Sequence, residues 1–187
     1  MSEKGVFKQR TLDTTNEHLD HASDKFTVML LGDSMFERFK TTGEDFKFPD
    51  HLFNAGIGGD KIENVIYRLI SLNLLDSFPN VKKIILMIGT NNMNVKNPKY
   101  EGIIDALIKI LKNKNIEIIM YGIPYIIDSP KEKIDKYNKY LDKFVNDKSV
   151  NTFTNISNLF TDEDYDDKVH FNKKGYKKFY DQIIRDL

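Results

Sequence analysis

Runs of apolar residues recur along the chain, and most of them stop at a glycine or an asparagine. Four such runs cover residues 28–31, 52–54, 84–88 and 116–121, and a weaker one lies near 150–156. Short runs of this kind are typical of strands that are buried on both faces of a parallel sheet. The sequence therefore predicts a mostly parallel sheet of about five strands.

The segments between these runs carry apolar residues at helical spacing. The clearest stripes lie within residues 62–70, 103–111, 134–145 and 176–187. Asp60, with Glu63 three positions later, is interpreted as the cap of the first of these helices, and Asn172 as the cap of the last. Strands that alternate with helices form a parallel sheet covered on both faces. We therefore expect a three-layer α/β/α fold of the flavodoxin-like type.

The length of 187 residues suits one domain, which we place at residues 25–187. Residues 1–24 contain few apolar side chains and no periodicity. They are predicted to form an N-terminal arm that drapes over the domain or frays.

The composition argues against several classes of protein and of functional site. The chain has 28 basic and 28 acidic residues with no basic block, which argues against nucleic acid as a partner. It contains no cysteine, so a disulfide, a cysteine-based zinc site and a thiol nucleophile are excluded. No apolar run is long enough to span a membrane, and no secretion signal is evident. We expect a soluble cytoplasmic protein that acts on a small molecule.

Small polar residues follow the strands at the edge where ligands bind in open α/β sheets. Asp33-Ser34 follows the first strand, Gly58-Gly59-Asp60 the second, and Thr90-Asn91-Asn92 the third. A fourth segment, residues 164–170, precedes the last helix and can reach the same edge. Because parallel strands end on one side of the sheet, segments far apart in sequence are expected to converge there.

The converging residues suit acyl transfer through a serine. Ser34 directly follows a strand and precedes a predicted helix, a position that suits a nucleophile. Of the four histidines, His170 alone has an aspartate, Asp167, at a spacing that can orient its ring. The backbone N–H groups of Ser34 and Gly59 and the side-chain amide of Asn91 can hold an oxyanion.

Each of these residues also has a simple structural interpretation. Ser34 can be a helix N-cap, and the pair Gly58-Gly59 can serve only to turn the chain into its helix. Asn91 can be a turn residue, and the acidic run before His170 can be a solvated loop. The catalytic interpretation rests on four such clusters occurring together.

The four clusters also carry a resemblance to a known family. Gly32-Asp33-Ser34, Asn54-Ala55-Gly56-Ile57-Gly58-Gly59-Asp60, Gly89-Thr90-Asn91-Asn92 and Asp167-Lys168-Val169-His170 resemble, in order and spacing, the signature blocks of the SGNH hydrolases, or GDSL-type esterases. The second and third blocks are most similar to the platelet-activating-factor acetylhydrolase-like branch. Met35 and Phe36 depart from the strict GDSL spelling, which concerns the pocket rather than the chemistry.

The resemblance implies a flavodoxin-like fold and a hydrolase. It also implies Ser34 as nucleophile, His170 as base, Asp167 as its partner, and Gly59 and Asn91 as oxyanion donors. The Gly-x-Ser-x-Gly motif of the α/β-hydrolases is absent, because residue 36 is Phe.

We therefore predict a serine esterase that needs no cofactor or metal. A small apolar pocket lined by Met35, Phe36, Met93 and Tyr125 would favour short acyl groups such as acetyl. One alternative is a metal-dependent phosphoesterase with Asp33, Asn91, Asp167 and His170 as ligands. Another is a ligand-binding module that kept the fold without turnover.

Overall fold

A single five-stranded sheet forms the centre of the molecule. The structure is a computed structural model and describes residues 8–187. All strands are parallel, and their order is β2-β1-β3-β4-β5. Their bounds are β1 Val28–Gly32, β2 Leu52–Asn54, β3 Lys83–Met87, β4 Glu117–Tyr121 and β5 Thr152–Thr154. The bounds of each strand differ from those of an apolar run by at most two residues, so the predicted strands are confirmed.

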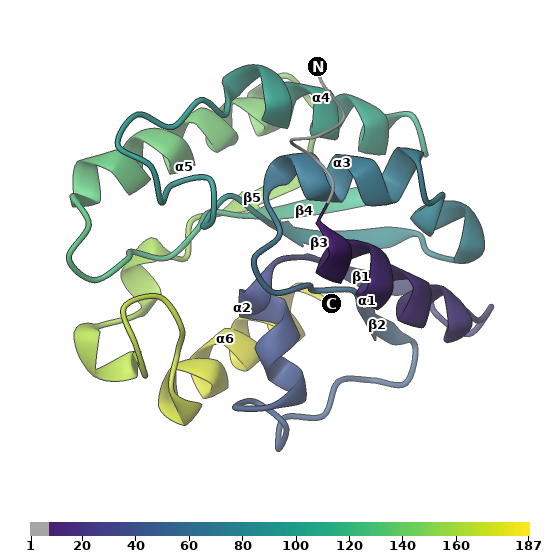
Figure 1. Cartoon of the computed structure of the whole chain (residues 1–187), viewed down its shortest axis with the longest axis horizontal. Helices are drawn as coiled ribbons and strands as arrows, with labels where there is room; N and C mark the ends of the chain where they lie inside the picture. The colour runs from purple at the N-terminus through teal and green to yellow at the C-terminus, as the bar shows by residue number, and fades with distance from the viewer. Residues whose placement is uncertain (1–7) are drawn as a thin grey trace.

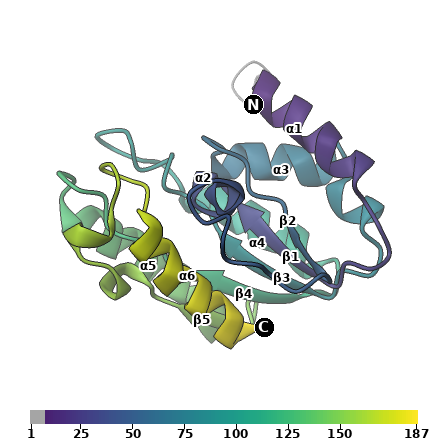
Figure 2. The same cartoon turned by 90° about the horizontal axis from the view of Figure 1, so that it is seen from below.

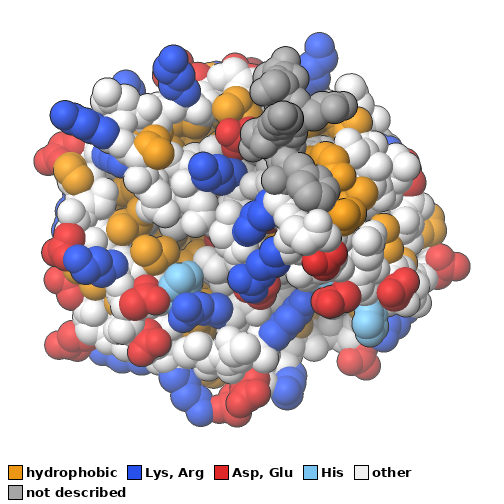
Figure 3. Space-filling model, viewed as in Figure 1, with side chains coloured by type: hydrophobic (Ala, Val, Ile, Leu, Met, Phe, Trp, Pro, Cys, Tyr) orange, Lys and Arg blue, Asp and Glu red, His pale blue; other side chains and the backbone are white. Residues whose placement is uncertain are grey.

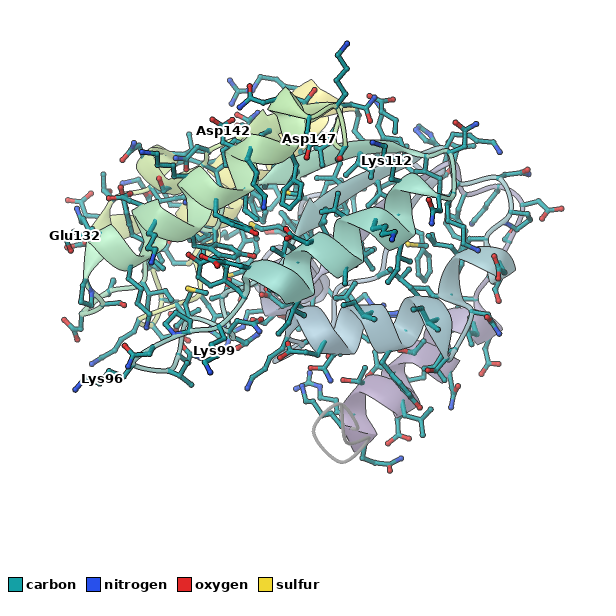
Figure 4. All side chains as sticks on the ribbon, turned by 90° about the horizontal axis from the view of Figure 1, so that it is seen from above. Lys96, Lys99, Lys112, Glu132, Asp142 and Asp147 are labelled. Atoms are coloured by element: carbon teal, nitrogen blue, oxygen red, sulfur yellow. The ribbon has the colours of Figure 1, made fainter. Side chains whose placement is uncertain are left out.

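Helices cover both faces of the sheet. The helices α3 (Ile62–Ile70), α4 (Glu101–Lys112) and α5 (Lys131–Asn146) lie on one face, and α2 (Ser34–Glu37) and α6 (Lys173–Asp186) lie on the other (Figure 1). Figure 4 shows α5, α4 and α3 side by side along the first face. Short 3₁₀ helices occur at Arg38–Lys40, Leu74–Ser77, Ser157–Leu159 and Asp162–Asp164. The predicted three-layer, flavodoxin-like fold is confirmed.

The central strands are apolar because neither of their faces meets water. All five residues of β1 are buried, and so are Ile84 to Met87 of β3. Gly32 pairs with Met87 across these strands, and a Cβ at Gly32 would overlap the Met87 carbonyl oxygen. The end of β1 therefore accepts only a glycine without displacing β3.

The N-terminal arm contains a helix that the sequence pattern did not predict. Helix α1 (Gln9–Asp20) packs beside α3 at the β2 edge of the sheet, as Figure 2 also shows. Its buried side chains are Thr11, Thr15 and His18, at the spacing of one helical face. Because that face is polar, a search for apolar periodicity misses it. Residues 1–7 of the predicted arm lie outside the described residues.

A buried charged network helps to hold helix α1, in addition to the packing of Leu19 against the core. Asp60 and Arg68 are both fully buried, and the Arg68 guanidinium lies 3.4 Å from Asp60 Oδ2. Thr11 donates its hydroxyl to Asp60 Oδ1 at 2.6 Å, and Arg68 donates to the Ala55 carbonyl at 2.7 Å. A buried carboxylate needs such partners, because an unpaired one is costly.

Asp60 therefore does not cap α3, and that prediction was wrong. Instead Asn64 accepts from the Lys61 N–H, and Asn92 accepts from the Ile62 N–H, at 2.9 and 3.0 Å. The predicted cap of the last helix is confirmed, because Asn172 accepts from the Gly175 N–H. None of the helices formed by residues 8–187 is long and apolar enough to cross a bilayer.

Candidate active site

Ser34 lies where β1 gives way to α2. Asp33 caps this short helix, accepting the Met35 N–H at 3.0 Å, and Ser34 is its first residue. Ser34 is only 9% exposed as a residue, yet it lines a cavity at the carboxyl edge of the sheet. The predicted nucleophile is thus held on a short turn fixed by its buried neighbour.

His170 and Asp167 reach Ser34 from the other end of the chain. The Ser34 Oγ atom lies 2.9 Å from His170 Nε2, and His170 Nδ1 lies 2.7 Å from Asp167 Oδ2. The carboxylate can only accept, so Nδ1 carries the proton and Nε2 is free to accept from the serine hydroxyl. The structure brings these three predicted residues together in one hydrogen-bonded line.

Asp167 is fixed by its own loop. Its Oδ1 atom accepts the backbone N–H groups of Val169 and His170, both at 2.7 Å. Burial raises the pKa of Asp167, but the hydrogen bonds from His170 and Val169 outweigh it and hold the pKa at about 2. Asp167 is therefore ionised at every pH at which the protein would be assayed.

The loop between β4 and α5 braces the loop that holds His170. Ile127 donates its N–H to the Lys168 carbonyl at 2.9 Å, and the Tyr165 hydroxyl donates to the Tyr125 carbonyl at 2.6 Å. These contacts attach the loop to residues 125–127 on both sides of Asp167. The position of the His170 ring therefore depends on residues 125–127, some 40 positions earlier in the chain.

Gly59 and Asn91 face the same cavity from the two neighbouring loops. Gly59 has φ +76°, in the left-handed region where a side chain is strained. Asn91 donates one side-chain N–H to the Asp60 carbonyl at 2.9 Å, which leaves its second amide hydrogen for another acceptor. Tyr137 supports the Asn91 loop from below, donating its hydroxyl to the Ile88 carbonyl at 2.7 Å.

The cavity that these residues share has a volume of about 570 Å³. Ten residues line it. We call the predicted residues Ser34, Gly59, Asn91 and His170 its floor, and the others, which are mostly charged or polar, its wall: Lys8, Arg10, Glu37, Arg38 and Thr41, with Gly58. All predicted site residues except Asp167 therefore line one cavity, and Asp167 lies directly behind His170.

The predicted apolar pocket was wrong. Met35, Phe36 and Met93 are at most 1% exposed and belong to the core, where Phe36 stacks on Phe179. Tyr125 lines a separate cavity of about 700 Å³ between the loops 125–131 and 160–165. The wall residues, of which Arg10 lies on α1 and Glu37 on α2, were missed because charged and polar side chains give no apolar signal.

The ligand set of the metal-dependent alternative is not assembled. Asp33 is fully buried next to Ser34, and the Asp167 carboxylate accepts a hydrogen bond from the ring of His170. Among residues 8–187 no three His, Asp or Glu side chains come together in a way that could hold a metal ion. The geometry is instead that of a hydroxyl, a base and an acid in series.

Comparison with known proteins decides the family. Residues 30–178 match the model of the GDSL-like lipase/acylhydrolase family, and this range contains every predicted site residue. The chain belongs to that family. It is therefore an enzyme that hydrolyses esters, as the sequence predicted.

Similar proteins and solved structures extend the match. The human platelet-activating factor acetylhydrolase IB subunit alpha2 is 28% identical over 175 residues, covering 86% of this chain and 75% of that protein. A GDSL-like lipase from Bacteroides thetaiotaomicron superposes with a TM-score of 0.76 at 16% identity, covering 93% and 95% of the two chains. The catalytic domain of a Streptococcus pneumoniae peptidoglycan O-acetyltransferase, carrying a methylsulfonyl adduct, superposes with a TM-score of 0.67 at 21% identity. The match covers 86% of this chain and 91% of that one.

Asp33 of this GDSL-like acylhydrolase is a buried carboxyl next to the predicted nucleophile. Its side chain is fully buried, and Oδ2 has no hydrogen-bond partner among the described residues. Burial raises the pKa of Asp33 to about 7, against an ordinary value of 3.8, although the Met35 N–H lowers it. Between these two pH values the folded protein keeps a proton that the unfolded chain has lost.

This difference predicts how stability depends on pH. As pH rises from 5 to 8, the free energy of unfolding should fall in the wild type by roughly 2 kcal/mol more than in Asp33→Asn, which cannot titrate. Urea unfolding at both pH values measures it. Asp142→Asn, on the exposed surface of α5 (Figure 4), is the matched control. If the free energy of unfolding fell equally with pH in the wild type and in Asp33→Asn, the raised pKa of Asp33 would be contradicted.

Proposed function

We propose that the protein is a serine esterase that hydrolyses esters of short, acetyl-like acyl groups through an acyl-serine intermediate. The observation that carries the proposal is the 2.9 Å contact between Ser34 Oγ and His170 Nε2 on the floor of the cavity. Gly59 and Asn91 line the same cavity, which supports them as donors to the carbonyl oxygen of an ester bound against Ser34.

In the first half of the reaction, His170 takes the hydroxyl proton while Ser34 Oγ attacks the ester carbonyl carbon. The carbonyl electron pair moves to its oxygen, and the Ser34 and Gly59 N–H groups with the Asn91 amide hold the resulting oxyanion. Asp167 holds the imidazolium that forms. Collapse of the intermediate breaks the bond to the alcohol oxygen, which takes the proton from His170 and leaves.

In the second half, His170 removes a proton from a water molecule, and the oxygen of that water attacks the acyl-serine. The same donors hold the second oxyanion. When this intermediate collapses, Ser34 Oγ recovers its proton from His170, and the carboxylic acid leaves. His170, ionised transiently in both halves, ends neutral, so the enzyme is restored.

The chemistry of the wall supports a short acyl group. A long acyl chain gains about 0.8 kcal/mol for each methylene that it buries in an apolar channel. The wall residues here are Lys8, Arg10, Glu37, Arg38 and Thr41, which provide no such channel. Two of the similar proteins are also named for acetyl groups, the acetylhydrolase and the O-acetyltransferase.

Loss of one oxyanion donor should slow the enzyme without abolishing it. We expect Asn91→Ala to lower kcat on p-nitrophenyl acetate by roughly 100- to 1000-fold, because one amide no longer stabilises the transition state. Asn94→Ala is the matched control, since Asn94 is exposed three residues further along the same loop. Unchanged kcat in a folded Asn91→Ala protein would remove Asn91 from the mechanism.

The proposed acyl preference predicts an order of substrates. In a series of p-nitrophenyl esters from acetate to octanoate, kcat/KM should be highest for acetate or propionate and fall with each added methylene pair. The leaving group is the same throughout, so the series reports only the acyl site. A rate that rises steadily to octanoate would contradict the short-acyl proposal and leave the serine mechanism standing.

A further inference from the structure

The wall of the cavity carries more positive charge than the protein as a whole. Three cationic side chains and one carboxylate line it, whereas the chain has 28 basic and 28 acidic residues. Figure 3 shows Lys and Arg side chains gathered across the middle of the face drawn, over α1 and α2. A concave site lined by one sign of charge concentrates ligands of the opposite sign.

Lys8 brings one of these charges to the oxyanion side of the cavity. Its Nζ atom donates to the Gly58 carbonyl at 2.6 Å. The same Nζ atom would lie 2.7 Å from a Cβ at Gly59. The nearest carboxylate is Asp60, at 3.9 Å, and Asp60 is already paired with Arg68. The Lys8 side chain is 35% exposed, so this ammonium can meet a ligand.

Arg38 brings a second charge to the cavity, next to Asp167. Its guanidinium lies 3.7 Å from Asp167 Oδ2, which is longer than a hydrogen bond. Both carboxylate oxygens of Asp167 already accept from the backbone or the ring of His170. The Arg38 side chain is 31% exposed, and its planar fork of N–H groups matches a carboxylate or a phosphate.

The one acidic side chain in the wall does not cancel these charges. Glu37 accepts two hydrogen bonds from Arg10, at 2.9 and 3.0 Å, so these two residues form a closed pair. Its carboxylate is thereby kept from repelling an anion in the cavity. Of the three cations, Arg10 is thus closely paired. The carboxylates nearest to Lys8 and Arg38, at 3.9 and 3.7 Å, already accept shorter hydrogen bonds from other residues.

We propose that Lys8 and Arg38 form a subsite for an anionic group on the alcohol part of the ester, a carboxylate or a phosphate. The inference rests on the proposed function. An acetyl-like acyl group has no position for a charge, so the anionic group belongs to the alcohol. The Lys8 contribution also gives α1 a role at the site, since α1 begins at the next residue.

The test compares matched charged and neutral esters. The first pair is 4-acetoxybenzoate and its methyl ester, and the second is 1-acetylglycerol 3-phosphate and 1-acetylglycerol. The measured quantity is the ratio of kcat/KM for the anionic ester to that for the neutral one. Arg38→Gln and Lys8→Gln should each lower this ratio about tenfold, the effect of one charge-assisted hydrogen bond. Differences in leaving-group reactivity cancel, because each ratio is compared between wild type and variant.

Two further measurements complete the experiment. Arg185→Gln removes an exposed arginine of α6, outside the cavity, and should leave the ratio unchanged. Raising the salt concentration from about 0.01 M to about 1 M shortens the Debye length from about 30 Å to about 3 Å, and should lower the wild-type ratio. A larger fall for the phosphate pair than for the carboxylate pair would identify a phosphate as the preferred group.

The subsite is disproved if neither substitution and no change of salt alters the ratio for either pair. Hydrolysis of the neutral esters, and its loss in Ser34→Ala, reports on the proposed function separately. If the protein hydrolyses neutral esters through Ser34 and the ratio is equal in all variants, the esterase proposal stands and the subsite proposal fails.

Discussion

The common direction of the strands is the constraint from which the rest of the site follows. Because β1 and β3 are parallel and in register from Val28 and Lys83 to Gly32 and Met87, both strands end at the same edge. The chain that leaves β1 carries Ser34, and the chain that leaves β3 carries Asn91. Gly32 makes this close pairing possible, since any side chain there would meet the Met87 carbonyl. Two residues 57 positions apart thereby reach one cavity.

Polar side chains then fix the loops that the sheet has brought together. Asn91 donates to the Asp60 carbonyl, and Asn92 accepts from the first N–H of α3, so the second and third loops hold each other. Asp60 is in turn fixed by Arg68 and Thr11 in a buried network. Such networks position groups more tightly than apolar contacts, because each hydrogen bond has a direction. The proposed oxyanion donors therefore depend on α1, which lies outside the sheet and its covering layers.

Most of the fold and the residues on the cavity floor could be predicted from the sequence, because their signals are local. The run of Ile84 to Ile88 indicates a buried strand wherever it lies, and the structure shifts it by one residue only. The pairing of His170 with Asp167 was predicted from their spacing of three residues, and the two do form a hydrogen bond. Their contact with Ser34 could be inferred only from the direction of the strands.

The features that were missed depend on contacts between distant residues. Asp60 looked like a helix cap, and only the buried Arg68 explains why its side chain turns the other way. Helix α1 was missed because its buried face consists of threonine and histidine. Met35 follows the strand closely and looked like part of a pocket, but the packing of α6 places it in the core, where its carbonyl accepts from the Tyr176 hydroxyl.

The central claim is that Ser34, activated by His170, forms the covalent bond to the acyl group. It is tested most directly by treating the intact enzyme with a dialkyl fluorophosphonate and locating the adduct by peptide mass spectrometry. We expect one phosphonyl group on the peptide that contains Ser34, none in Ser34→Ala, and much slower labelling in His170→Ala. An adduct on another residue, or active enzyme that stays unlabelled, would contradict it.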